Sequence, residues 1–432
     1  MVRVPLRIVV GLAWLVPAAR PQVTLAPEVV NLVRIKQGMR RELERVVNIT
    51  CLEVIDRSRV TRSGAVRRTD TIRLEVALVE GKELFAWPGS ERFDERPLES
   101  MIGSGAVSTG AFGILARTVF ASIWPAFRYV GEESLDGRRA LRYDYEVPSN
   151  ARGYRVTIDK RQATVGFRGS FWADAQTLDV LRLTAEALDI PIEIGLSGSQ
   201  ETIDYARVPI GEERILLPQQ AESVLTFWSG ERSRNVTQFT GWLQYRGESR
   251  LLTEVSPEVV ASPAAPTRTI ELPAGLVVAA RLETAIDSDK AAVGDLLVAR
   301  IERPVERNGQ TLVPAGARLT GRLRWLQRIS DSTSLIALDF TELNFEGAKA
   351  RVTATLEALA DPSGRVRRFT GGVREARIPK ARGTIYETSE IKVPDILGVS
   401  WITVAAAHFR IAPGLRMTWK AIQPPMDADS RR

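Results

Sequence analysis

Apolar and polar residues alternate over most of this chain, with the period of two that is typical of β-strands. In "TIRLEVALVEG", the residues Ile72, Leu74, Val76 and Leu78 fall on one side, with mostly polar residues between them. The same alternation runs through "LRYDYEV", "GYRVTID", "LRLTAEA", "AESVLTFWSG" and "VTQFTGWLQYRG". This pattern predicts a large antiparallel sheet that buries one face.

Two segments have helical spacing instead. The first, "LAPEVVNLVRIKQGMRRELERVV", places Pro27 in the first-turn position and has an apolar face. The second, "STGAFGILARTVFASIWP", follows a Gly/Ser-rich stretch and ends before Pro125. We expect it to pack on the concave side of the sheet, either lining a ligand pocket or filling the space as ordinary core. The candidate pocket residues are Phe112, Leu115, Val119, Phe120, Ile123 and Trp124.

A short proline-glycine turn recurs in the second half of the chain. It is "LPAG" at residues 272–275, "VPAG" at 313–316 and "APG" at 412–414. A four-residue turn favours Pro in its second position and Gly in its fourth, and each of these turns leads into an alternating run. Residues 268–424 are therefore predicted to form a small β-barrel or sandwich. The Pro/Ala/Ser-rich segment 255–267 is the expected linker to a first domain over residues 28–254.

The two ends of the chain differ from both predicted domains. Arg3 and Arg7 precede a twelve-residue apolar stretch, which is typical of a secretory signal peptide. We predict a signal peptide over residues 1–20. The pattern does not fix its cleavage position, which could lie as late as residue 26. An uncleaved anchor is the alternative. We expect no transmembrane span in the mature chain, and a periplasmic or secreted location. Residues 361–394 lack periodicity, and residues 425–432 form a polar tail.

Composition narrows the chemistry. The net charge of +7 and the pI of about 9.7 come mostly from scattered arginines, so we predict no nucleic-acid partner. The chain has one cysteine, Cys51, and one histidine, His408. An intramolecular disulfide is therefore excluded. A zinc site built on these two residues would need several carboxylates as further ligands. The sequence therefore predicts no catalytic residues, no metal and no cofactor.

One stretch resembles the outer-membrane lipoprotein carrier and sorting proteins of the LolA/LolB type. In "GSFWADAQTLDVLRLTAEA" an aromatic-Asp segment begins a turn and an apolar strand runs back, and Trp172, Asp174 and Thr177 are the matching positions. The resemblance covers residues 28–254. It implies a half-open barrel, closed by helices, that holds acyl chains.

A second stretch resembles the C-terminal β-barrel of TrbI-like type IV secretion and conjugation proteins. The matching positions are Pro273, Gly275, Ser288, Asp289, Gly309, Pro314, Gly316 and Gly321. The segment between Asp361 and Pro394 lacks the two apolar helices that form the pore in that family. The resemblance thus implies a shared fold more than a shared role in secretion.

Together these observations predict a mainly β protein: an N-terminal curved antiparallel half-barrel with two helices, then a small C-terminal β-barrel or sandwich. The leading hypothesis is an exported cell-envelope protein without catalytic activity. It would bind an apolar or lipidic ligand, such as a lipoprotein acyl chain, or an envelope protein partner through its N-terminal half-barrel. A structural scaffold of an envelope or secretion complex is the alternative, and an envelope hydrolase is third.

Overall fold

The computed structural model describes residues 25–46, 49–79, 82–90, 92–94, 98–102, 111–151, 154–158, 161–244, 268–346, 348–360, 366–370, 375–376, 391–392 and 398–423. The predicted signal peptide (1–20), linker (255–267) and tail (425–432) lie outside these residues, as does most of 361–394. The limits of the two predicted domains stay a prediction. Within the described residues, no helix has the length and apolar character needed to cross a membrane.

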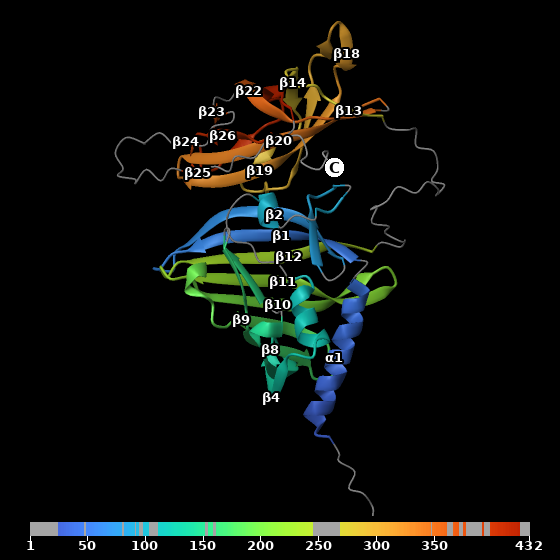
Figure 1. The fold of residues 1–432 in the computed structure, drawn as a ribbon, viewed down its shortest axis with the longest axis vertical. Helices are drawn as coiled ribbons and strands as arrows, with labels where there is room; N and C mark the ends of the chain where they lie inside the picture. Colours follow the sequence, from blue (N-terminus) through green and yellow to red (C-terminus); the bar gives the residue numbers. More distant parts are fainter. Residues whose placement is uncertain are drawn as a thin grey trace, which may run out of the picture.

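The first sheet is antiparallel and has ten strands, as the alternating pattern predicts (Figure 1). In spatial order the strands are β3 (Lys82–Ala86), β2 (Val66–Val79), β1 (Ile49–Val60), β12 (Arg232–Gln244), β11 (Glu213–Phe227), β10 (Leu196–Ile210), β9 (Val180–Ala187), β8 (Phe167–Asp174), β5 (Arg138–Val147) and β4 (Ala126–Leu135). A separate hairpin joins β6 (Tyr154–Ile158) and β7 (Arg161–Val165). The sheet has two free edge strands, β3 and β4, so it is a large open sheet. The predicted half-barrel closure is wrong here.

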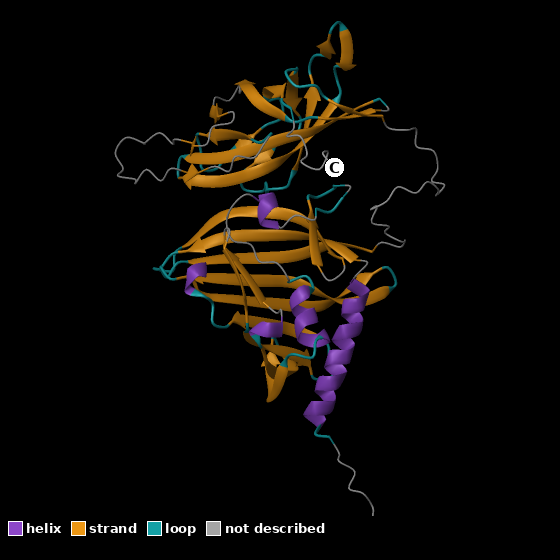
Figure 2. Ribbon diagram, in the orientation of Figure 1, coloured by secondary structure: helices purple, strands orange, loops and turns teal. Residues whose placement is uncertain are grey.

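Helices cover one face of this sheet (Figure 2). The predicted first helix is confirmed as α1 (Pro27–Arg45). The second predicted helix begins with the short α3 (Ile114–Ala116) and continues as a π-helical turn, η2 (Arg117–Ala121). The remaining helical segments are α2 (Leu98–Ile102) and the 3₁₀ turns η3 (Ser149–Ala151) and η4 (Ile192–Ile194). One apolar core joins the covered face to α1, α2 and the α3–η2 segment.

The second sheet is the curled one of the two. Its main path is β13 (Arg268–Glu271), β21 (Ala348–Arg351), β20 (Thr333–Phe345), β19 (Arg318–Ser330), β16 (Leu296–Ile301), β14 (Val277–Leu282), β28 (Arg416–Ala421) and β22 (Ala354–Ala360). β26 (Ser400–Val404) pairs with β20, and β23 (Val366–Thr370) pairs with β26. Two-stranded pairs are β15 (Ile286–Asp287) with β27 (Arg410–Ile411), β17 (Val305–Arg307) with β18 (Gln310–Val313), and β24 (Glu375–Ala376) with β25 (Ile391–Lys392). This sheet encloses its own core.

The recurring proline-glycine turns shape this second sheet as expected. Gly275, Gly316 and Gly414 all have positive φ, at 88°, 84° and 107°. Each lies two residues before a strand, namely β14, β19 or β28. The φ > 0 requirement explains why glycine is repeated at these three positions.

The loop between β15 and β16 joins the two sheets. The Val293 N–H donates to Thr71 O, and the Arg73 N–H donates to Val293 O, both at 2.8 Å. This places the loop along the part of β2 that β3 leaves unpaired. The Val293 side chain is buried in the core of the first sheet. An ion pair between Arg73 and Asp295 also joins the two sheets.

Candidate functional site

The covered face of the first sheet carries a row of mostly apolar side chains that are direct neighbours across nine strands. In order from β2 to β4 the row is Ile72, Ile55, Thr237, Ala221, Ile203, Leu183, Phe171, Tyr143 and Tyr129. Side chains alternate between the two faces of a strand, so the period-two pattern of the sequence places them together. This row forms an apolar floor beneath the helices.

The α3–η2 segment, with the three residues before it, covers part of this floor. We call residues 111–121 the cover segment. Its Phe112 ring is stacked on Trp242, with centroids 6.0 Å apart, and Phe120 meets Phe171 edge-on at 5.1 Å. Leu115 and Val119 are buried in the same core. The cover segment therefore binds to the sheet chiefly through apolar and aromatic contacts.

Polar contacts hold the cover segment at both of its ends. A carboxylate oxygen of Glu83, on edge strand β3, accepts hydrogen bonds from Gly113 N at 3.0 Å and Ile114 N at 3.4 Å. At the other end, Arg40 Nη2 of α1 lies 3.5 Å from Ala121 O. Glu83 thereby satisfies backbone donors at the start of α3.

The structure brings four of the six predicted pocket residues together. Phe112, Leu115, Val119 and Phe120 are buried against the apolar floor. Ile123 and Trp124, by contrast, are exposed, with fractional exposures of 89% and 48%. The predicted helix ends at Ala121, and the two residues that were expected on its apolar face lie outside the core.

A row of polar side chains runs beside the apolar floor on the same face. Its members, again direct cross-strand neighbours, are Asp70, Arg57, Asn235, Ser223 and Glu201, and all five are buried. Arg57 and Asp70 form a two-point ion pair, with Nε–Oδ1 at 2.7 Å and Nη2–Oδ2 at 2.6 Å. Pairing of this kind is what allows charged groups to be buried.

Glu53 is buried on the same face, two residues before Ile55. Burial raises the pKa of its carboxyl group well above the usual value, and the nearby carboxylates of Glu83 and Glu201 raise the pKa further. Burial likewise raises the pKa of Tyr205, whose hydroxyl has no hydrogen-bond partner in the described structure. The covered face thus combines an apolar floor with polar groups that favour their uncharged forms.

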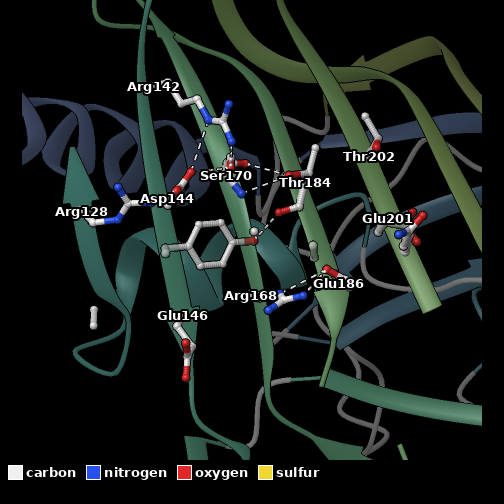
Figure 3. Close-up of a pocket in the computed structure, with 15 residues that line it drawn as sticks. Arg128, Arg142, Asp144, Glu146, Arg168, Ser170, Thr184, Glu186, Glu201 and Thr202 are labelled. Atoms are coloured by element: carbon white, nitrogen blue, oxygen red, sulfur yellow. Dashed lines mark hydrogen bonds and ion pairs between the residues drawn. The ribbon is translucent and has the colours of Figure 1, made fainter. Parts of the chain in front are cut away.

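The opposite face of the sheet has a polar cleft over strands β4, β5, β8, β9 and β10 (Figure 3). Its volume is about 640 Å³. Its arginines are paired with carboxylates: Arg168 Nη2 lies 3.2 Å from Glu186 Oε2, and Arg142 Nε lies 3.3 Å from Asp144 Oδ1. Arg128 is also paired with Asp144. Because these arginines already have carboxylate partners, the cleft offers little attraction for an anion.

The floor of this cleft depends on a glycine. A Cβ atom added at Gly169 would lie 1.9 Å from Thr184 O, so only glycine fits between β8 and β9 at this point. The Ser170 N–H donates to the side-chain oxygen Oγ1 of Thr184 at 3.0 Å. This bond takes the place of a backbone hydrogen bond between β8 and β9. Tyr145 Oη crosses from the covered face to donate to Thr184 O at 2.6 Å. The absence of a side chain at Gly169 therefore leaves room for the Tyr145 hydroxyl to reach Thr184 O.

The single histidine and the single cysteine are engaged or buried. His408 is exposed, and its Nδ1 lies 2.6 Å from Asp289 Oδ1 while its Nε2 lies 2.9 Å from Arg328 Nη1. Both ring nitrogens are thus occupied. Burial raises the pKa of the Cys51 thiol, which disfavours a reactive thiolate. Among the described residues, no cluster of three or more His, Cys, Asp or Glu side chains could hold a metal ion.

About half of the chain is similar to solved structures of the lipoprotein-sorting type. A Vibrio parahaemolyticus domain named for outer membrane lipoprotein sorting is 12% identical, with a TM-score of 0.27, over 50% of this chain and 92% of that one. A LolA superfamily protein from Nitrosomonas europaea is 14% identical, with a TM-score of 0.27, over 51% and 97%. A DUF1329 family protein from Desulfovibrio piger is 15% identical, with a TM-score of 0.28, over 51% and 95%. With such low scores, these similarities do not define what this chain binds.

No protein-family model and no curated protein matches the chain. The predicted likeness of the second domain to TrbI-like barrels therefore finds no support. The repeated turns on which it was based are explained by the positive-φ glycines that precede β14, β19 and β28.

The buried polar row was not predicted, although the sequence contains a signal for it. Glu53 and Arg57 fall at the same strand parity as Cys51 and Ile55, so the alternation itself places them on the buried face. The outer cleft had no comparable signal. It is lined by residues from five strands, β4, β5, β8, β9 and β10, and depends on the irregular ladder between β8 and β9.

Proposed function

We propose that this chain is a non-enzymatic carrier of an apolar or lipidic ligand, held between the apolar floor of the first sheet and the cover segment. The residues proposed to contact the ligand are Phe112, Leu115, Val119, Phe120, Ile123 and Trp124. The periplasmic or secreted location predicted from residues 1–20 is part of this proposal.

The observation that carries the proposal is the contrast between floor and cover. The floor is a continuous row on a ten-stranded sheet, whereas the cover is a three-residue helix followed by a π-turn. π-helical turns are rare in proteins overall, and those that occur are often found at functional sites. Displacement of the cover would expose Phe171 and its apolar neighbours to a ligand that restores the lost apolar contacts.

Ile123 and Trp124 mark the end at which such a ligand would enter. They follow the π-turn directly and are exposed, although both are large and apolar. Exposed residues of this kind mark interaction sites when they gather at one place. A chain with its polar end in water and its tail under the cover would pass between them.

The direct test is extraction of the purified, exported protein with organic solvent, followed by mass spectrometry of the extract. We expect a lipid in stoichiometric amount. Binding of a fluorescent twelve-carbon fatty acid to the delipidated protein is the second measurement. Absence of both a copurified lipid and saturable binding of the probe would reject the carrier proposal.

A matched pair of variants tests the site. Phe120 and Phe340 are both fully buried, and each meets an aromatic ring edge-on, at 5.1 Å to Phe171 and 5.2 Å to Trp419. F120A and F340A should each cost about 3–5 kcal/mol of unfolding free energy. Phe120 is proposed to contact the ligand, whereas Phe340 lies in the core of the second sheet, so only F120A should weaken binding of the fatty acid. An equal change in both variants would place the binding elsewhere.

A further inference from the structure

Exposed large hydrophobic side chains gather on one flank of the first sheet. Among the described residues there are thirteen such side chains, and seven of them belong to three segments: Leu25, Val29, Val33, Ile123, Trp124, Tyr129 and Val130. The remaining six are scattered over both sheets. A concentration of this kind on one flank indicates a binding surface.

Direct contacts show that these three segments are neighbours. Helix α1 runs beside edge strand β4 and the turn that precedes it (Figure 1). The contacts are Tyr143 Oη to Glu28 O at 2.8 Å, Lys36 Nζ to the Phe127 ring centroid at 4.7 Å, and Arg40 Nη2 to Ala121 O at 3.5 Å. Tyr129 adjoins Tyr143, with ring centroids 5.1 Å apart. The exposed side chains therefore lie along one junction.

A single stripe of α1 faces this junction. Val29, Val33, Lys36 and Arg40 are spaced i, i+4, i+7 and i+11, which places them in one line along the helix. Two exposed valines are thus followed by two cations. We call this stripe, with Ile123, Trp124 and Tyr129, the α1–β4 flank.

The two cations of the flank favour an anion. Neither Lys36 nor Arg40 has a carboxylate within ion-pair distance in the part of the chain that is described. Burial, and next the charge of Arg40, lowers the pKa of Lys36, so a negative group placed here would stabilise both side chains. The arginines of the outer cleft differ, since they already have carboxylate partners.

We infer that the α1–β4 flank docks on the surface of an anionic lipid bilayer. Trp124 and Ile123 would enter the interfacial layer, where tryptophan is favoured, and Lys36 and Arg40 would contact lipid phosphates. Lysine is depleted in the centres of protein interfaces, which favours a bilayer over a protein partner. The inference concerns binding to a surface and does not require a bound ligand under the cover.

The test uses the exported protein after delipidation, sedimented with vesicles of phosphatidylcholine alone or with about one-third phosphatidylglycerol. We expect binding to the anionic vesicles only, reduced by high salt. The double variants I123S/W124S and K36E/R40E should each lower the partition coefficient about tenfold or more. Brominated lipid should quench a part of the tryptophan fluorescence that W124F lacks.

Matched controls use residues of the same kind elsewhere on the first sheet. Ile192 and Trp228 are exposed to 70% and 61%, so I192S/W228S removes equal apolar surface away from the flank. R155E changes an exposed charge on β6. Both should leave the partition coefficient unchanged.

Three outcomes would overturn the inference. The first is equal binding to neutral and anionic vesicles, and the second is an equal loss of binding in the controls. The third is loss of a dimer or of a protein partner in I123S/W124S without any vesicle binding by the wild type. Failure of the carrier proposal would look different, because the protein would bind vesicles and yet contain no lipid under its cover.

Discussion

At the scale of single residues, Glu53 is the clearest case of a polar group that the fold has to accommodate. Its neighbours on the same face of β1 are the apolar Cys51 and Ile55, and the Glu53 side chain is 5% exposed. Burial, with the carboxylates of Glu83 and Glu201 nearby, favours the protonated form in the folded protein. The unfolded chain has no such preference, so the residue links stability to pH.

The sign of this link follows from the raised pKa of Glu53. No stability is lost below the unfolded pKa of about 4.3, and stability falls as pH rises from there toward the folded pKa. Glu53→Gln keeps the shape without the charge, so we expect E53Q to be more stable than the wild type at pH 8 and to lose most of that advantage by pH 5. Urea unfolding at pH 5, 6.5 and 8 measures the difference.

Glu44→Gln provides the control for this experiment. Glu44 lies on the exposed side of α1, and its removal takes no charge out of the core. The difference in unfolding free energy between E44Q and the wild type should stay within about 0.5 kcal/mol at all three pH values. An E53Q advantage that does not grow with pH would contradict the buried-carboxyl interpretation.

At the scale of elements, the alternating pattern predicted strands well because burial on one face is a local property of the sequence. The "LRYDYEV" run became β5, with Leu141, Tyr143 and Tyr145 on the buried face. The second helix was predicted too long. Its apolar residues have helical spacing. In the structure, however, Phe112 and Phe120 pack on aromatic residues of distant strands. A local sequence pattern does not specify such long-range contacts.

Gly169 shows how one element limits its neighbour. Because an added Cβ would lie 1.9 Å from Thr184 O, Gly169→Ala must push β8 and β9 apart and should lose about 2 kcal/mol or more of unfolding free energy. Urea unfolding measures the loss. Gly198→Ala on β10 is the matched control, because its nearest neighbour would be Thr226 at 3.7 Å and the change should be nearly neutral. Equal losses in both variants would mean that general strand preference, and not the close approach, sets the cost.

At the scale of the whole molecule, the contact between the two sheets is what the sequence could least predict. The loop "IDSDKAAVGD" has the composition of an ordinary turn. In the structure its Val293 is buried in the core of the other sheet, and Arg324 of β19 lies over the Trp87 ring at 4.7 Å. Such a contact joins two surfaces that are more than 200 residues apart in the chain. The sequence of neither surface, taken by itself, indicates that it is an interface.

Gly294 is the residue through which this contact can be tested. Its φ is +101°, and an added Cβ would lie 2.4 Å from Arg73 O and 2.7 Å from the Trp87 ring. Gly294→Ala should therefore lift the loop from β2, in addition to a backbone cost of about 1 kcal/mol. Gly309→Ala is the matched control, since Gly309 also has a positive φ, at +77°, but has nothing within 4 Å of the added atom.

Hydrogen exchange gives the readout that separates these two variants. The amides of Arg73 and Val293 are bonded across the junction, so both should lose protection in G294A and keep it in G309A. Calorimetry should show the unfolding of G294A separating into two transitions, because the edge of β2 no longer links the two cores. If both amides stay protected in G294A, then the remaining contacts, such as the Arg73–Asp295 ion pair, suffice to hold the sheets together.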